Sequence, residues 1–358
     1  MKNREGTRTE AETAARLAET LPQLLEGLKL TKVRLEMQPR SPGPDISVQI
    51  EVGATKRTLA IEVKQIGEPR IALQAIGQLQ RLGGRFAGAY PVLAAPYLTE
   101  SARLICKEAG VGYIDLSGNV FLRFDGVFIE RTTAHALKQE RRALRSLAMP
   151  RTSRVIRRCL SDPSKPFMIT ELADLTDVSP AQVFKVANLL EMKGYARRDE
   201  GRRLLLTRPS ELLEAWAGSL DFRNNTIVPA YSLARTPEAI MKSLAEAATK
   251  GGKRYALTTF AGASLIAPSV RFYDVTCYVE REVEWWLEKL DLERVETGSN
   301  VQLVVPRDDS VLAESQKVGR YRVASNIQLF ADLYGNPARG REAAETLRLL
   351  KLRFRVRD

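Results

Sequence analysis

The sequence predicts an α/β protein with three domains, and three observations support this prediction. The chain has 358 residues, which is enough for two or three buried cores. Strand-like apolar runs alternate with amphipathic helices before residue 134 and again after residue 211. Between these regions, a basic segment has the pattern of short helices followed by a β-hairpin. We therefore place an N-terminal α/β domain at 1–134, a small helical domain at 135–210 and a C-terminal α/β domain at 211–358.

Composition excludes several classes of protein. No apolar run approaches the roughly 18 residues that a membrane helix needs, and the charged N-terminus lacks the apolar core of a secretory signal. The cysteines Cys106, Cys159 and Cys277 are far apart and form neither a zinc spacing nor a disulfide framework, so we expect reduced thiols in a cytoplasm. His135 is the only histidine, which argues against histidine-based metal sites and catalytic triads.

The net charge of +12 is concentrated in the central segment. Residues 135–208 carry +8, against +3 for residues 1–134 and +1 for residues 209–358. A merely soluble surface would spread its charge more evenly. A focused basic block instead favours a polyanionic partner, most simply nucleic acid.

The N-terminal domain reads as a helix, a β-hairpin and further alternating elements. Leucines at helical spacing predict a helix at 8–30. The elements that follow are strands at 33–38, 46–52 and 58–64, a helix at 69–83, a strand at 91–98, a helix at 100–110 and short strands within 112–132.

The hairpin PDISVQIEVGATKRTLAIEVK at 44–64 gathers charged residues at its open end. Pairing the strands about a turn at residues 53–56 places Asp45 opposite Lys64, with Glu62 on the same face as Lys64. Two carboxylates so close repel each other unless a positive group lies between them. Mg²⁺ takes such oxygen ligands and lowers the pKa of a bound water. Asp45, Glu62 and the Val63 carbonyl are therefore candidate metal ligands, and Lys64 could orient the water.

The motif formed by Pro44-Asp45 and Glu62-Val63-Lys64 resembles that of the PD-(D/E)xK nuclease superfamily. The resemblance implies a restriction-endonuclease-like core in which Asp45 and Glu62 bind metal and Lys64 assists catalysis. It also implies a glutamine on the next helix and an acid upstream, for which the candidates are Gln74, Gln78, Glu26 and Glu36.

An alternative without a functional role is a surface hairpin whose Glu–Lys ion pair contributes well under about 1 kcal/mol to folding stability. However, LAIEVKQI is otherwise apolar, so Glu62 and Lys64 should be largely buried. Burying a charge costs free energy, so such charges usually have a partner or a function. The other alternative is a nuclease fold that has lost cleavage and serves as a DNA-binding platform.

The basic segment predicts a winged helix-turn-helix. Ser179 caps a helix that begins with Pro180 and turns Val183, Val186 and Ala187 inward. YARRDEGRRLLLT at 195–207 forms the hairpin, or wing, that follows. The alternative, a small helical dimerisation module, explains the apolar pattern but not the arginines.

The candidate DNA contacts are the outward residues of that helix and the arginines around it. Short polar side chains on such a helix read base edges, whereas arginines bind phosphates. The candidates are Ser179, Gln182, Lys185, Asn188, Arg197, Arg198, Arg202, Arg203, Arg154 and Arg158.

Three further stretches resemble the AbiEi family of antitoxins and transcriptional regulators. They are EAGVGYIDLSGNVFLRFDG at 108–126, RYALTTFAGASLIAPSVRF at 254–272 and ASNIQLFADLYGNPARGREAAETLR at 324–348. The resemblance covers about residues 90–358 and implies promoter binding, autoregulation and a nucleotidyltransferase-type toxin as partner. Two features depart from that family, because the winged helix is internal and the nuclease-like hairpin has no role there.

These patterns predict a sequence-specific regulator of double-stranded DNA, acting as a homodimer on a palindromic operator. The alternative is a Mg²⁺-dependent DNA endonuclease in phage or plasmid defence, targeted by the winged helix. A weaker alternative is an interaction module that neutralises a toxin.

Overall fold

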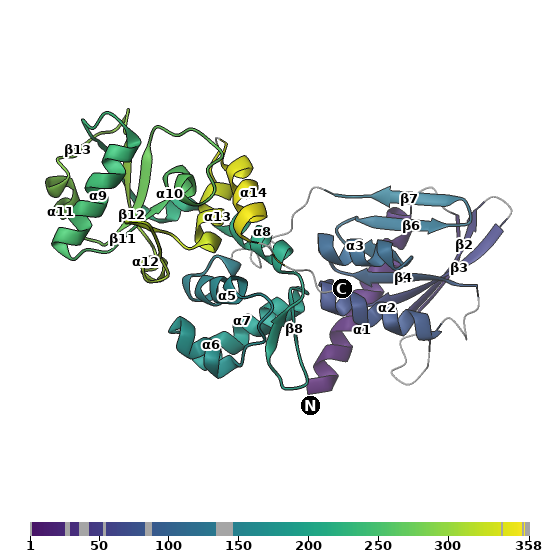
Figure 1. Cartoon of the computed structure of the whole chain (residues 1–358). Coiled ribbons are helices and arrows are strands. Elements are labelled where there is room, and N and C mark those ends of the chain that lie inside the picture. Colours follow the sequence, from purple (N-terminus) through teal and green to yellow (C-terminus); the bar gives the residue numbers. More distant parts are fainter. Residues whose placement is uncertain are drawn as a thin grey trace. The chain divides into compact units, whose positions relative to one another are not determined.

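The computed structural model describes residues 2–25, 29–35, 43–52, 55–82, 88–133, 146–337, 339–352 and 354. The chain forms two compact units (Figure 1). The first comprises residues 1–141 and 189–194, and the second comprises residues 142–188 and 195–358. The predicted α/β class is confirmed, whereas the division into three domains stays a prediction. No helix in the described part of the chain is long and apolar enough to cross a membrane.

The first unit is built on a seven-stranded sheet whose strands follow chain order. The strands β3, β4 and β5 are parallel, and the other neighbours are antiparallel. Parallel neighbours need crossover connections, which two helices supply. The elements are α1 (Lys2–Leu24), β1 (Lys29–Leu35), β2 (Ile46–Val52), β3 (Thr55–Val63), α2 (Pro69–Leu82), β4 (Tyr90–Ala95), α3 (Glu100–Glu108), β5 (Gly112–Asp115), β6 (Val120–Phe124) and β7 (Val127–Arg131).

Each face of this sheet packs against helices, which gives the unit two apolar cores. Leu17 and Leu21 of α1 lie in one core with strand residues such as Val92. Ile76 of α2 and Ile105 of α3 lie in the other core with residues such as Leu93 of β4. Because successive side chains of a strand point to opposite faces, β4 contributes to both cores.

The hairpin register differs from the prediction by two residues. Val52 pairs with Thr55, and Ile46 pairs with Ile61. Only two residues therefore connect β2 to β3, a loop length that hairpins favour. A shift of two keeps every side chain on its predicted face, because the side-chain period of a strand is two. Asp45, which precedes β2, consequently lies across from Glu62 rather than Lys64.

The second unit begins with two short helices, most of a third helix and a two-stranded hairpin, and residues 189–192 of the third helix belong to the first unit. These are α5 (Pro150–Ser161), α6 (Ile169–Thr176), α7 (Pro180–Met192), β8 (Ala196–Arg198) and β9 (Leu204–Leu206). The predicted inward residues Val183, Val186 and Ala187 are buried. Ser179 caps α7 by accepting a hydrogen bond at its Oγ from the backbone N of Gln182 at 3.4 Å, as predicted.

A second seven-stranded sheet, ordered β13-β10-β14-β12-β11-β16-β15, forms the rest of this unit. Its neighbours include both parallel and antiparallel pairs, as in β12–β14 and β11–β12. The elements are α8 (Pro209–Ser219), β10 (Thr226–Tyr231), α9 (Pro237–Gly251), β11 (Tyr255–Thr258), α10 (Thr259–Ile266), β12 (Val275–Val279), α11 (Val283–Lys289), β13 (Glu293–Arg294), β14 (Val301–Val305), α12 (Ser310–Ala313), β15 (Gln316–Val318), β16 (Tyr321–Val323), α13 (Asn326–Tyr334) and α14 (Gly340–Lys351), with a 3₁₀ turn at Phe222–Asn224.

Candidate functional site

The structure brings the predicted charged residues together at the end of β3. Asp45 Oδ2 accepts a hydrogen bond from the backbone N of Val63 at 2.7 Å. Lys64 Nζ donates to Glu62 Oε1, also at 2.7 Å. Only 8% of the surface of Glu62 is exposed, so this ion pair is largely removed from water. These contacts bring Asp45, Glu62 and Lys64 into one charged cluster.

Burial raises the pKa of Glu62 above its usual range, and the negative charge of Asp45 raises it further, while Lys64 lowers it. Burial also raises the pKa of Asp45, whereas the hydrogen bond from Val63 and the charge of Lys64 lower it. The carboxylates therefore repel one another in a poorly solvated place, with one ammonium group to compensate them.

The sequence prediction missed a third acid, Glu10 of α1. Burial raises the pKa of Glu10, and its charge interacts with those of Lys64 and Asp45. The predicted alternatives Glu26 and Glu36 lie outside the described residues. A signal was present in the sequence, because Glu10 shares a helical face with the buried Ala14 and Leu17.

A groove beside this cluster is lined by Glu10, Lys64, Gln74 and Gln78, together with Arg81. Gln74 and Gln78 are four residues apart on α2, so they point in the same direction. The structure therefore places both predicted glutamines in the groove that Lys64 also lines.

The donor set suits a hard cation, although it is sparse. Among the residues that the structure describes, no three His, Cys, Asp or Glu side chains gather into a metal-binding group. Asp45 uses Oδ2 for Val63, and Glu62 uses Oε1 for Lys64, which leaves the second oxygen of each carboxylate for a metal. Mg²⁺ is often held by one or two carboxylates with several waters, so these two residues fit it.

The second candidate region is the outward side of α7 and the neighbouring hairpin. Ser179, Lys185 and Asn188 are exposed, and Gln182 is half-buried. Arg197, Arg202 and Arg203 of the hairpin segment are exposed as well. We call the α7–hairpin surface the set Ser179, Gln182, Phe184, Lys185, Asn188, Arg197, Arg198, Arg202 and Arg203.

Two arginines of this surface hold neighbouring side chains in place. Arg198 donates from Nη2 to Asn188 Oδ1 at 2.8 Å, and its guanidinium lies 5.0 Å from the ring centre of Phe184. Arg203 donates from Nε to Asp199 Oδ2 at 2.8 Å, within the turn of the hairpin. Phe184 was not among the predicted contacts, although its position four residues before Asn188 places it on the same helical face.

Arg154 and Arg158 of α5 contact other residues of the protein. Arg154 donates from Nε to both oxygens of Asp308, at 2.9 and 3.0 Å, and from Nη1 to Asp177 at 3.4 Å. Arg158 donates from Nη1 to Ser161 Oγ at 3.0 Å and lies over the ring of Phe167. These contacts occupy Arg154 and Arg158, so we leave both residues out of the α7–hairpin surface.

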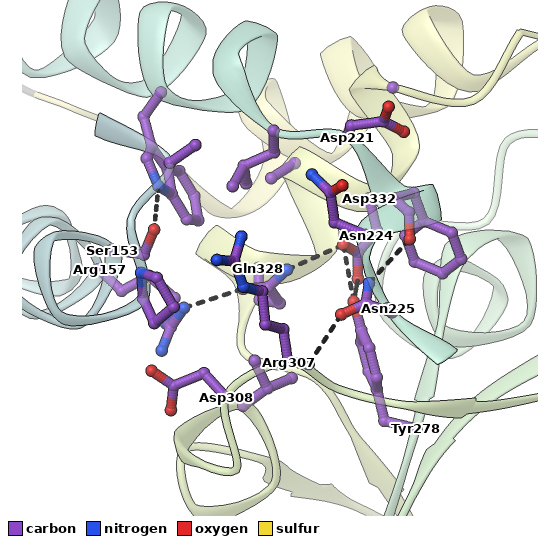
Figure 2. A pocket seen from close by; sticks show the side chains of 18 residues that line it. Ser153, Arg157, Asp221, Asn224, Asn225, Tyr278, Arg307, Asp308, Gln328 and Asp332 are labelled. Carbon is purple, nitrogen blue, oxygen red and sulfur yellow. Dashed lines mark hydrogen bonds between the residues drawn. The ribbon is translucent and has the colours of Figure 1, made fainter. Parts of the chain in front are cut away.

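Arg157 joins α5 to a polar cluster that the sequence did not reveal (Figure 2). Its guanidinium donates to Glu314, to Ser310 and, through Nη1 at 3.2 Å, to Gln328 Oε1. Gln328 Nε2 in turn donates to Asp332 Oδ1 at 2.8 Å. A chain of hydrogen bonds thus runs from α5 to the interior of the C-terminal sheet region.

Asp332 of α13 is the centre of this cluster. It accepts hydrogen bonds from Thr258 Oγ1 at 2.5 Å and from the Tyr278 hydroxyl at 3.0 Å, besides Gln328. Burial raises the pKa of Asp332 to about 6, although these donors and the charge of Arg157 oppose the shift. Tyr278, Gln328 and Asp332 also line a cavity of about 80 Å³. The sequence feature that could have indicated this cluster is the pair Gln328 and Asp332, two polar residues four apart in the apolar stretch IQLFADLY.

Asp115 has a structural role in the stretch at 108–126. Its carboxylate accepts hydrogen bonds from the backbone N of Leu98, Ser117 and Asn119, and from Asn119 Nδ2. The fully buried carboxylate therefore holds the turn between β5 and β6.

No family model and no curated protein match this sequence. Among solved structures, that of EndoMS in its apo form is similar to 30% of this chain at 21% identity, with a TM-score of 0.23. The match spans 45% of the EndoMS chain, less than half of its length. A similarity of this extent establishes no family.

Proposed function

We propose that the protein is a sequence-specific regulator that binds double-stranded DNA through the α7–hairpin surface. The observation that carries this proposal is one exposed basic surface, shared by the outer side of α7 and the hairpin β8–β9. Helices α5, α6 and α7 with the hairpin then constitute a winged helix-turn-helix, with α7 as the recognition helix.

The chemistry of the surface fits this role. An α-helix fits the major groove, where Lys185 and Asn188 can hydrogen-bond base edges. Arg197 and Arg202 of the hairpin segment are available for phosphates, which fix the position and orientation of a protein on DNA. The basic composition of residues 135–208 supports the same interpretation.

The resemblance of three stretches to AbiEi regulators gives this proposal a finer form. In that form the protein is a cytoplasmic homodimer that represses its own promoter, and a nucleotidyltransferase-type toxin is its partner. The nuclease-like fold of the first unit would then serve as a platform.

The proposal is tested by selecting the duplexes that the protein binds from a random library. Footprinting is then carried out on the selected sequence. We expect one enriched motif with two-fold symmetry and a protected footprint that covers it. Equal binding to all duplexes, or no binding in low salt, would contradict the proposal. A scrambled duplex of the same composition is the control.

A second candidate function, favoured by the cluster at the end of β3, is Mg²⁺-dependent cleavage of DNA. Asp45 and Glu62 would hold the metal, which when bound supplies charge stabilisation and an activated water. Lys64 would hold the water or stabilise negative charge on the phosphate, while Glu10, Gln74 and Gln78 would line the approach.

For this second candidate, we expect the wild-type protein to nick supercoiled plasmid in Mg²⁺ or Mn²⁺. Glu62→Gln and Lys64→Ala should each lower the nicking rate by about 100-fold or more, because a metal ligand or the ammonium group that positions the water and stabilises charge is lost. Glu51→Gln, on the same hairpin but outside the cluster, is the matched control. Nicking that is equal in all four proteins would come from a contaminant and would rule out this site.

A further inference from the structure

Phe184 is the one apolar residue in the otherwise polar, basic set that makes up the α7–hairpin surface. Its side chain is 49% exposed, and it is the fifth residue of α7, between the N-cap Ser179 and Asn188. The first turns of a recognition helix are the part that reaches base edges in the major groove. The position of Phe184 is therefore that of a base contact rather than a phosphate contact.

The neighbours of Phe184 hold its ring on this surface. The Arg198 guanidinium lies 5.0 Å from the ring centre, a distance at which a cation is attracted by the ring face. Arg198 is itself hydrogen-bonded to Asn188 Oδ1 at 2.8 Å, so three side chains from α7 and β8 support one another. Single exposed apolar residues are common on proteins. An exposed ring held by an arginine that is itself hydrogen-bonded to Asn188, on a proposed base-reading face, is a more specific arrangement.

We propose that Phe184 contacts the C5-methyl group of a pyrimidine in the major groove, an inference that rests on the proposed DNA binding. The methyl group is the apolar feature that the major groove presents, and an aromatic ring is a suitable partner for it. Thymine carries this group, and 5-methylcytosine carries the same group at the same ring position. Lys185 and Asn188 then supply the hydrogen bonds of the same readout.

The experiment changes the methyl group without changing any hydrogen bond of the base pair. The selected duplex is rebuilt with each thymine replaced in turn by deoxyuridine, and in a second series with each cytosine replaced by 5-methylcytosine. Affinities of the full-length protein are measured for wild type, Phe184→Ala and Tyr273→Ala. Tyr273 is an exposed aromatic of the second unit outside the α7–hairpin surface, and its variant is the matched control.

We expect one position at which loss of the methyl group weakens wild-type binding about four-fold, the value of burying about one methylene-sized group. If the contacted base is a cytosine, no thymine position responds, and methylation of that cytosine in the second series instead strengthens wild-type binding by about the same factor. Phe184→Ala should abolish the difference, and Tyr273→Ala should keep it.

Two outcomes would overturn the inference while leaving the proposed function intact. One is wild-type binding that is insensitive to every substitution in both series. The other is equal sensitivity in Phe184→Ala, with circular dichroism showing that the variant is folded. Absence of any sequence-selective binding would instead overturn the proposed function, and this inference with it.

Discussion

Replacing Lys185, Arg197 and Arg202 together by alanine is expected to weaken binding to the selected DNA site by about 100-fold. Each charge-assisted contact to a phosphate or base contributes on the order of 1 kcal/mol or more, and three contacts at separate positions add approximately. Loss of three cations should also reduce the slope of log affinity against log salt by up to about three, because fewer counterions are released.

The three residues are chosen because they are exposed and because, in the part of the chain that the structure describes, their side chains form no ion pair or side-chain hydrogen bond. Arg198 and Arg203 are retained, since they support Asn188 and Asp199 and their loss would disturb the surface itself. The variant therefore tests charge at the surface rather than its folding.

A matched variant separates position from net charge. Arg235, Lys250 and Arg271 are also exposed in the second unit, and their replacement by alanine removes the same +3 elsewhere. We expect this variant to lose less than about three-fold in affinity at physiological salt, because charges beyond a Debye length of about 8 Å are largely screened. Equal losses in both variants, measured by fluorescence anisotropy across salt concentrations, would show that only overall charge matters.

The sequence predicted elements well where one local pattern decides the structure. The alternation of β2 and β3, the inward residues of α7 and the cap at Ser179 all depend on neighbours within a few positions. The register of β2 against β3 also depends on the length of the loop between them, and the residues at 53–56 are compatible with more than one length. The prediction was therefore wrong by two residues, although the face of every side chain was right.

The candidate sites were harder to predict, because partners distant in sequence define them. Glu10 joins Asp45 only after α1 packs on the sheet, and the sequence gives no measure of that packing. Arg154 was predicted to contact DNA because its charge is visible in the sequence, whereas its hydrogen bond to Asp308 could not be seen because Asp308 lies more than a hundred residues away. Gln328 and Asp332 were visible as a pair, but their connection to Arg157 required the fold.

The buried carboxylate of Asp332 leads to the prediction with the largest expected effect on stability. Asp332→Ala should lower the free energy of unfolding of the second unit by about 3–5 kcal/mol, because Thr258, Tyr278 and Gln328 each lose a buried acceptor. All three tryptophans, Trp216, Trp285 and Trp286, belong to this unit, so urea unfolding followed by tryptophan fluorescence reports on it selectively.

The same carboxylate predicts a pH dependence with a definite sign. The pKa of Asp332 is raised from 3.8 to about 6 in the folded unit, so the folded state binds a proton more tightly than the unfolded state. This contribution is fully present below the unfolded pKa and is lost as pH rises through about 6. Wild type should therefore gain on the order of 1–2 kcal/mol between pH 7 and pH 5, since one pKa unit corresponds to about 1.4 kcal/mol.

Asp332→Asn separates the charge from the hydrogen bonds. It keeps one acceptor oxygen for Thr258 and Tyr278 but cannot titrate, so its stability should be nearly flat between pH 5 and pH 7. Asp221→Asn is the control, because Asp221 is paired with Arg223 near the surface and the pKa of its carboxyl is lowered, so it stays ionised over this range. A wild-type curve that is as flat as that of Asp332→Asn would mean that Asp332 is ionised in the fold. In that case Arg157 and the three donors, rather than burial, would determine its charge, and α5 would be held to the sheet region by a chain of bonds that ends on a true anion.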